Sequence, residues 1–366
     1  MIRILALPRF SFKGAGSRYR IHNYIPYLRK LGFTIDVSCF FEDNYLERLY
    51  RREWISPLLP AQAYLKRIST LLRSRSYDLV WINWEALPWM PYALESFLLS
   101  IGQRFVVDYD DALFHQYDSH KSSIVRWMLA DKVRYCMRDS AMVIAGNKYL
   151  ANYAENAGAS KVRILPTVVD LNKYECAAPR EPATLNIGWI GTPVTAKLLY
   201  SIEPALQQVC RDGSARLTLV GSGPIKLRGV PTTVRSWSET TEVQEIQQFD
   251  VGIMPLDEND RFCKGKCGLK LIQYMACGIP VVGTPLGVNT DLIQNDVTGY
   301  QASGVEEWTA ALNAMKTAVS NRQRMGINGR RLVEQKYSSQ AAEPRLAELL
   351  LEATGKGLCL PEKKAA

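Results

Sequence analysis

Residues 249–289 read FDVGIMPLDENDRFCKGKCGLKLIQYMACGIPVVGTPLGVN, and this stretch decides the fold. A short apolar run at 250–254 predicts a strand, and a polar loop then leads into a predicted helix over about 267–276. Gly278, in a Gly-x-Pro sequence, ends that helix. A second β-rich run follows at 279–283, so the stretch forms a strand–helix–strand unit of the kind that builds parallel sheets.

The same alternation of short β-rich runs and helical stretches continues through all 366 residues. In the first half it predicts strands at 2–7, 34–39, 78–83, 104–109, 141–145 and 162–165. The pattern then restarts, with strands predicted at 185–190, 216–220, 232–235, 250–254 and 279–283. We therefore expect an α/β protein with two Rossmann-like, doubly wound parallel sheets that face each other across a cleft.

The join between the two halves is expected at 175–184, where ECAAPREPAT has few periodic apolar residues and contains two prolines. This places an N-terminal domain at 1–178 and a C-terminal domain at 184–336. A last helix at 337–352 is expected to pack back toward the N-terminal domain, and 353–366 are expected to form a flexible tail.

The formal net charge is +9, and residues 1–182 hold 25 Lys and Arg against 18 Asp and Glu. A basic half favours an anionic partner such as a phosphate group or a membrane surface. The sequence has no aromatic RNA-binding run, so we expect no nucleic-acid partner.

The sequence also limits the compartment and the metal chemistry. No apolar run reaches the roughly 18 residues of a spanning helix, and MIRILALPRF at the start has no signal-peptide layout, so we expect a cytoplasmic protein. Eight irregularly spaced cysteines and three histidines argue against a metal site, and we expect the thiols to be reduced.

Three lysines surround the start of the helix predicted over 267–276. Lys266, Lys270 and Gln273 are separated by four and three residues, so we expect them on one helical face, and Lys264 adds a third ammonium group. The N–H groups of a helix N-terminus together with lysines form an anion site. A solvated basic surface loop is the alternative.

The segments FDVGIMPL, GKCGLKLIQYMACGIPVV and GVN resemble family 4 of the retaining glycosyltransferases (glycosyl transferases group 1), which has the GT-B fold, and a subgroup with a GKCGxKLIQYMACG signature. That family commonly carries two glutamates here, which align with Gly265 and Gln273. The resemblance implies that Gln273 hydrogen-bonds the ribose of a donor nucleotide and that the lysines hold its diphosphate. It implies donor-binding roles for Lys264, Gly268, Leu269 and Gln273 and catalytic roles for Lys266 and Lys270.

Other loops of the second half follow predicted strands and are expected at the same edge of the sheet. By resemblance to the family, Thr192 is expected to contact the donor diphosphate. Gly221, Gly223 and Trp237 follow predicted strands at this edge and are expected near the base or ribose of the donor. A helix N-cap is the alternative for Thr192, and a plain turn is the alternative for the two glycines.

In the first half, GAGSRYR resembles the family's glycine-rich acceptor-side loop, so Gly16 and Arg18 are expected to contact donor phosphate or acceptor. A basic surface turn is the alternative. Glu85, at the end of another predicted strand, is a further candidate.

Asp110, Asp111 and His115 follow the strand predicted at 104–109 and are the catalytic candidates of this half, expected to hydrogen-bond acceptor or donor hydroxyls. Structural capping is the alternative for Asp111. Asp108-x-Asp110 resembles the metal-binding D-x-D of the other large glycosyltransferase fold. Because that fold has a single N-terminal nucleotide-binding domain and this chain has two Rossmann-like halves, we expect no metal.

Residues 45–75 mix arginine and lysine with leucine, tyrosine and tryptophan. Such a basic amphipathic stretch can lie on anionic lipid, so we expect peripheral association with a membrane. Ordinary helices packed on a sheet, with solvated arginines, are the alternative.

Together these features predict a glycosyltransferase that moves a hexose from a nucleoside diphosphate sugar to a hydroxyl of a growing, lipid-linked glycan. The resemblance implies retention of configuration and a setting in surface polysaccharide or glycoconjugate biosynthesis. We expect no cofactor besides the nucleotide-sugar co-substrate, because lysines and a helix dipole can replace a metal's charge. The alternatives are a non-catalytic scaffold or glycan-binding protein, a nucleotide-sugar isomerase of the same fold, and a dehydrogenase. The dehydrogenase ranks last, because this sequence has no full G-x-G-x-x-G after its first predicted strand.

Overall fold

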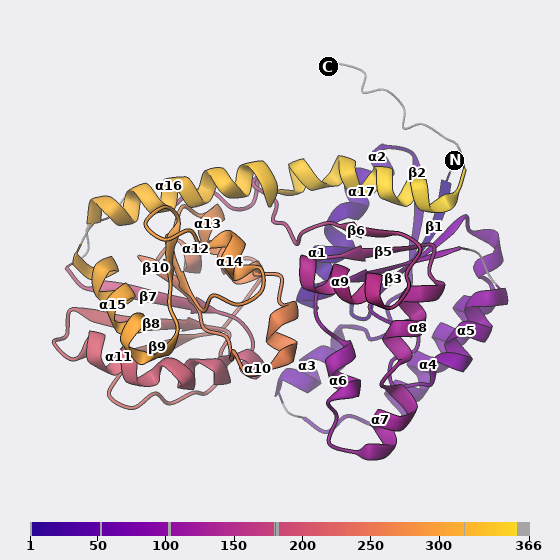
Figure 1. Cartoon of the computed structure of the whole chain (residues 1–366), viewed down its shortest axis with the longest axis horizontal. Helices are drawn as coiled ribbons and strands as arrows, with labels where there is room; N and C mark the ends of the chain where they lie inside the picture. Colours follow the sequence, from indigo (N-terminus) through magenta and orange to yellow (C-terminus); the bar gives the residue numbers. More distant parts are fainter. Residues whose placement is uncertain are drawn as a thin grey trace. The chain divides into compact units, whose positions relative to one another are not determined.

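The computed structural model describes residues 2–51, 53–101, 104–178, 180, 183–317 and 319–356. The chain divides into two compact units, one formed by Met1–Thr167 with Ala342–Ala366 and the other by Val168–Ala341. Each unit is built around its own six-stranded parallel sheet (Figure 1). The predicted α/β architecture with two doubly wound sheets is confirmed.

The sheet of the first unit has the strand order β2-β1-β3-β4-β5-β6, with every neighbouring pair parallel. Its strands are β1 (Ile2–Leu7), β2 (Phe33–Val37), β3 (Leu79–Asn83), β4 (Phe105–Tyr109), β5 (Met142–Ala145) and β6 (Val162–Ile164). Its helices are α1 (Ala15–Arg20), η1 (His22–Tyr24), α2 (Ile25–Lys30), α3 (Asp43–Arg51), α4 (Leu58–Leu72), η2 (Ser74–Ser76), α5 (Tyr92–Ile101), α6 (Phe114–Asp118), α7 (Ser123–Leu129), α8 (Lys132–Asp139) and α9 (Lys148–Asn156). The central strands β3 and β4 are buried along their whole length, as expected for a sheet covered on both faces.

The sheet of the second unit has the order β12-β11-β10-β7-β8-β9, again with parallel neighbours. Its strands are β7 (Leu185–Ile190), β8 (Ala215–Val220), β9 (Thr232–Arg235), β10 (Val251–Met254), β11 (Val281–Gly283) and β12 (Gly299–Gln301). Its helices are α10 (Pro193–Ala196), η3 (Lys197–Ile202), α11 (Glu203–Cys210), α12 (Glu242–Ile246), η4 (Arg261–Gly265), α13 (Leu269–Ala276), α14 (Asn289–Leu292), α15 (Gly304–Thr317) and α16 (Val319–Lys336). The eleven predicted strands are present, each within two residues of its expected bounds, and β12 was not predicted.

The chain passes from the first unit to the second after Thr167, upstream of the interval 175–184 in which the composition places the join. Val169 bridges Ser338, and the Ala177 amide donates to the Cys277 carbonyl at 2.8 Å, so this segment bonds to the second unit although it lacks a periodic apolar pattern. The last helix, α17, spans Ser339–Thr354 and belongs to the first unit from Ala342 onward. Of the expected tail, residues 357–366 lie outside the described residues.

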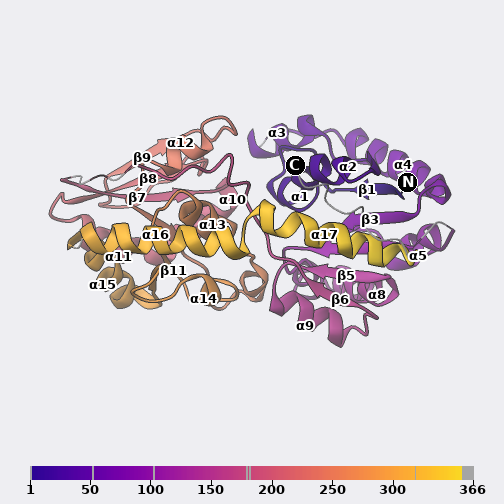
Figure 2. The ribbon, with the colours of Figure 1, turned by 90° about the horizontal axis from the view of Figure 1, so that it is seen from above.

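Helix α13 is fixed against the second sheet by an aromatic ring over a glycine. A Cβ atom on Gly252 would lie 2.2 Å from Tyr274 Cδ2, so only glycine leaves room for this ring. The Tyr274 hydroxyl also accepts a hydrogen bond from the Ile190 amide at 2.9 Å. On its other side α13 packs against α16, where a Cβ on Gly326 would lie 1.9 Å from the Gly278 carbonyl oxygen (Figure 2).

We expect Gly252→Ala to lower the free energy of unfolding by about 1–3 kcal/mol, because the added methyl group forces Tyr274 and α13 away from the sheet. Urea unfolding would measure the loss. In a Tyr274→Ala background the same change should cost much less, because the ring it strikes is gone. If Gly252→Ala lowered the free energy of unfolding equally in both backgrounds, the packing of the Tyr274 ring on Gly252 would be contradicted.

Candidate functional site

The carboxyl ends of parallel strands meet at one edge of a sheet, and in the second unit four loops with predicted site residues leave that edge. They follow β7, β8, β9 and β10. Gly221 has φ 76°, and a Cβ there would lie 2.4 Å from the Gly191 carbonyl oxygen and 3.0 Å from Trp237 Cβ. Gly223 packs in the same way on Pro193, at 3.1 Å. The glycine pair therefore forms tight turns that bring three of these loops together.

The N-terminus of α13 opens at this edge. Its N-cap is Gly268, in the left-handed conformation with φ 68°, where a Cβ would lie 2.5 Å from Leu292 Cδ1. Among the residues that the structure describes, no side chain hydrogen-bonds as its cap, and its first turn, which begins at Leu269, holds no acidic residue. The first turn of α13 therefore supplies no anionic side chain to balance the positive end of the helix dipole.

Lys270 reaches from the first turn of α13 to the loop after β7. Its Nζ lies 5.2 Å from the ring centroid of Trp189 and donates to Thr195 Oγ1 at 3.5 Å. Thr192 caps α10 in a reciprocal arrangement with Thr195, so the N-cap alternative describes its side chain. A positive charge is thereby held beside the uncapped end of α13.

The other two lysines precede the helix. Lys266 has an extended backbone and follows η4. Gly268, in the left-handed conformation, is the N-cap of α13, so the helix begins only at Leu269 and does not include Lys266. The prediction that Lys266, Lys270 and Gln273 share one helical face is therefore wrong. The Lys266 ammonium lies 4.6 Å from the ring centroid of Phe262. Lys264 lies within η4, and its carbonyl oxygen packs against Gly287 of the loop after β11.

Gln273 is buried, and its Nε2 donates to the hydroxyl of Tyr174 at 2.7 Å. Tyr174 in turn donates to Glu242, which also accepts from Trp237 Nε1 at 2.8 Å. Sequence reasoning singled out Gln273 and Trp237 and missed Tyr174 and Glu242. No local motif could reveal them, since Tyr174 and Gln273 are 99 residues apart.

In the first unit, Gly16 and Asp110 come together at the carboxyl edge of the sheet. A Cβ on Gly16 would lie 3.4 Å both from Asp110 Oδ2 and from Trp84 Cζ2. Trp84 Nε1 donates to Asp110 Oδ1 at 2.6 Å, and the guanidinium of Arg9 lies 5.4 Å from the Trp84 ring centroid. Trp84, which sequence reasoning missed, has φ 69°, a conformation that costs a tryptophan energy and often marks functional sites. Burial, and then the neighbouring charge of Asp111, raise the pKa of Asp110 to about 6.

His115 is buried and held from both sides. Its Nδ1 lies 2.8 Å from Asp118 Oδ2, and its Nε2 lies 2.8 Å from the Tyr149 hydroxyl. Arg18 is buried as well, with its guanidinium 5.0 Å from the ring centroid of Tyr19, so the surface-turn alternative does not describe it.

Two further acidic side chains, Asp108 and Glu85, form buried ion pairs. Asp108 forms a fully buried ion pair with Arg20 at 2.6 Å, which ties α1 to the end of β4. Glu85 is buried against Lys132 at 2.9 Å, and Lys132 also pairs with Glu95 at 3.1 Å. In the described part of the chain, no group of three or more His, Cys, Asp or Glu side chains is arranged to hold a metal ion.

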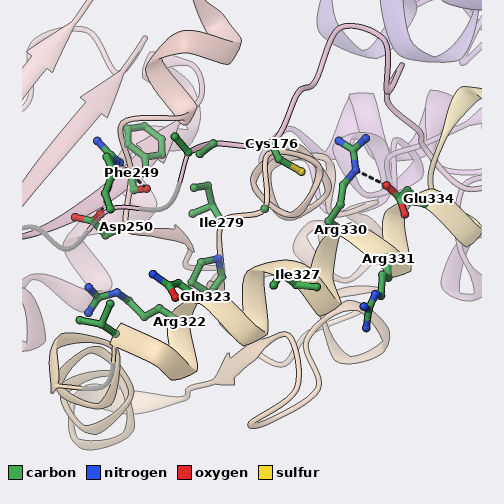
Figure 3. Close-up of a pocket in the computed structure, with 16 residues that line it drawn as sticks. Cys176, Phe249, Asp250, Ile279, Arg322, Gln323, Ile327, Arg330, Arg331 and Glu334 are labelled. Atoms are coloured by element: carbon green, nitrogen blue, oxygen red, sulfur yellow. Dashed lines mark hydrogen bonds and ion pairs between the residues drawn. The ribbon is translucent and has the colours of Figure 1, made fainter.

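A cavity of about 400 Å³ lies elsewhere in the second unit (Figure 3). Phe249 and Ile279, which line it, precede β10 and β11, so it opens at the amino ends of the strands. Three of its four arginines have protein partners: Arg330 donates to the Ala276 carbonyl, Arg322 donates to the Met315 carbonyl, and Arg180 pairs with Asp250 at 3.6 Å. Because it opens at the amino ends of the strands, the cavity lies at the opposite edge of the sheet from Lys264, Lys266 and Lys270.

Residues 184–318 match the family model of the glycosyl transferases group 1. The sulfoquinovosyl transferase of Arabidopsis thaliana is 26% identical over 180 residues, which cover 46% of this chain and 33% of that protein. The N-acetyl-alpha-D-glucosaminyl L-malate synthase of Bacillus anthracis is 27% identical over 157 residues, which cover 39% of each protein. The chain thus spans less than half the length of these curated relatives.

Solved structures match over nearly the whole chain. HepE of Anabaena, in complex with UDP and glucose, has a TM-score of 0.70 at 16% identity and covers 96% of this chain and 100% of its own. Sucrose-phosphate synthase of Thermosynechococcus elongatus has a TM-score of 0.73 at 13% identity and covers 97% and 100%. The fold is therefore the GT-B fold of these glycosyltransferases, and the family model supports the glycosyl transferases group 1.

We expect Asp110→Asn to stabilise the protein at neutral pH. With a pKa of about 6 in the folded chain and about 3.9 when unfolded, Asp110 binds its proton more tightly in the native state, so the free energy of unfolding falls as pH rises through this window. The Asp110→Asn variant has no carboxyl group to titrate at this position. Its free energy of unfolding should therefore exceed that of the parent by about 1–3 kcal/mol at pH 7.5, and by less at pH 4.5.

Urea unfolding at the two pH values would measure the difference. The exposed Asp291→Asn variant is the control and should show no pH-dependent gain. An Asp110→Asn variant less stable than the parent at pH 7.5 would contradict the assignment.

Proposed function

We propose that the chain is a metal-independent hexosyltransferase that uses a nucleoside diphosphate sugar and retains the anomeric configuration. The observation that carries the proposal is the uncapped N-terminus of α13 with Lys270 held beside it at the carboxyl edge of the second sheet. A helix N-terminus and a lysine form a site for a diphosphate. The matched family model and the relatives, all named as transferases or synthases, support the sugar chemistry.

In the reaction, the bond between the sugar C1 and the β-phosphate oxygen breaks, and a bond from C1 to the acceptor hydroxyl oxygen forms. The acceptor proton passes to the departing phosphate, so no protein base is required. Lys264, Lys266 and Lys270 stabilise the charge that develops on the diphosphate. At ~4 Å and an effective dielectric constant of about 20, each lysine–phosphate pair contributes roughly 4 kcal/mol before desolvation.

The acceptor side of the proposal rests on the first unit. Asp110 and Asp111 hydrogen-bond hydroxyl groups of the sugars, and the strained Trp84 holds the Asp110 carboxylate. Both ring nitrogens of His115 are bonded to Asp118 and Tyr149, so His115 acts by fixing these neighbours and does not contact the sugar itself. We place the acceptor on a lipid in surface glycan assembly, in line with the basic first half of the chain.

Membrane association is assigned to the exposed part of residues 45–75. No helix among the described residues is long and apolar enough to span a bilayer. Trp54 is 74% exposed, and Leu58 and Leu65 are about as exposed, among the exposed Arg48 and Arg51. Arg67 is buried and donates to the Ala86, Pro8 and Ser38 carbonyls, so it is not part of the basic face, and Arg52 lies outside the described residues.

We expect Lys270→Ala to weaken UDP binding at least about tenfold and to lower turnover by a similar factor, because one phosphate contact is lost. Calorimetric titration and release of UDP from UDP-hexose would measure both, and product NMR would report the anomeric configuration. Lys336→Ala, which removes an exposed lysine at the end of α16, is the matched control. Unchanged affinity and turnover in Lys270→Ala would overturn the diphosphate site.

We expect the protein to float with vesicles containing anionic phosphatidylglycerol and to stay behind with neutral ones. Trp54→Ser should lower the bound fraction several-fold, because an interfacial tryptophan is lost. Trp127→Ser, which removes an 83%-exposed tryptophan of α7, is the matched control. A loss with Trp127→Ser alone would contradict the assignment to 45–75.

A further inference from the structure

Helix α7 (Ser123–Leu129) carries large apolar side chains on its outer side. Of its seven residues only Leu129 is buried, and α7 packs mainly against its chain neighbours α6 and α8 (Figure 1). Ile124 is 67% exposed, Trp127 83% and Met128 43%. Side chains three and four residues apart lie on one side of a helix, so these three residues form one apolar surface, which we call the α7 face.

The α7 face is not what a short helix normally shows to water. A helix of seven residues is unstable by itself, and helices in proteins gain most of their stability by burying an apolar side. Here the apolar side is the exposed one. Apolar side chains grouped on a protein surface mark interaction sites, so we expect a partner to cover the α7 face.

The charges at the two ends of α7 are opposite. Lys121 precedes the helix by two residues, Asp131 follows it by two, and both are exposed. Ala130 and Asp131 keep the right-handed helical conformation, so Asp131, seven residues after Ile124, lies on the side of the α7 face. Within the chain Asp131 forms an ion pair with Arg134 at 3.9 Å, in which both side chains are more than half exposed.

A two-fold axis through the middle of α7 makes these features complementary to themselves. Ile124 and Met128 lie two residues on either side of position 126, and Lys121 and Asp131 lie five residues on either side. In an antiparallel pair of α7 helices, Ile124 therefore meets Met128 of the second copy, and Lys121 meets Asp131 of the second copy. Arg126 bends back and donates to the Lys121 carbonyl at 3.0 Å, so two arginines do not confront each other at the axis.

We propose that the α7 face binds a second copy of this chain through an antiparallel pair of α7 helices. This inference goes beyond the donor site and does not depend on it. A buried tryptophan covers about 150–250 Å², whereas a standard stable interface covers about 800 Å² on each partner. Because the α7 face has one tryptophan and two smaller side chains, the dimer is weak and forms only at high protein concentration.

The test follows the weight-average mass of the full chain by sedimentation equilibrium between about 1 and 300 µM protein. The mass of the parent should rise toward twice that of one chain. Trp127→Ser should weaken association at least about tenfold, because the largest apolar side chain of the contact is lost. Trp54→Ser, which removes a 74%-exposed tryptophan outside α7, is the matched control and should associate like the parent. Met128→Ser replaces Trp127→Ser if thermal melts show the latter to be unfolded.

A pair of charge reversals is the decisive arm. Lys121→Glu sets two carboxylates against each other at both ends of the pair, and Asp131→Lys sets two ammonium groups against each other. Each variant alone should therefore associate several-fold more weakly than the parent. An equimolar mixture of the two should recover the association of the parent, because both ends of the mixed dimer again join opposite charges.

The outcomes decide between a second copy and other partners. A parent that stays monomeric at about 300 µM, or a folded Trp127→Ser variant that associates like the parent, would overturn the inference. A mixture of the charge reversals that associates no better than its components would overturn it too. Flotation with anionic vesicles that is lost in Trp127→Ser alone would assign the α7 face to lipid and would equally overturn the second copy as its partner.

Discussion

The parallel direction of every strand is the constraint on which both units depend. Because neighbouring strands run the same way, all their carboxyl ends lie on one edge, and each loop that leaves this edge starts beside the others. In the second unit the ring of Tyr274 over Gly252 seats α13 against β10, so the helix opens at that edge with Gly268 as its N-cap and Lys270 in its first turn. The position of the lysine thus follows from the packing of a buried ring on a glycine.

The charged groups described above have different surroundings in the two units. In the first, Arg20 with Asp108 and Lys132 with Glu85 are buried ion pairs that hold loops in place. In the second, the positive end of α13 and Lys270 stand together without an acidic side chain in the first turn. A helix N-terminus with a lysine beside it is a place where an anion can bind, which is why we attach the proposed function to it.

The sequence predicted the strands and the positions of the loops that follow them well, because apolar runs and glycine turns are local signals. It failed where the determinant is conformational or distant. The left-handed Gly268 removed Lys266 from the helix, β12 is only three residues long, and the segment after Thr167 joins the second unit through backbone hydrogen bonds. Tyr174 and Glu242 meet Gln273 only in the folded chain, so no spacing could reveal them.

The central claim is that a diphosphate binds at the N-terminus of α13. A crystal structure of the protein soaked with UDP tests it most directly. The account predicts density for the diphosphate within hydrogen-bond distance of the first-turn N–H groups of α13 and of Lys270 Nζ, with the uracil toward Trp237. A diphosphate bound instead in the arginine-lined cavity of Figure 3, at the amino ends of the strands, would contradict it.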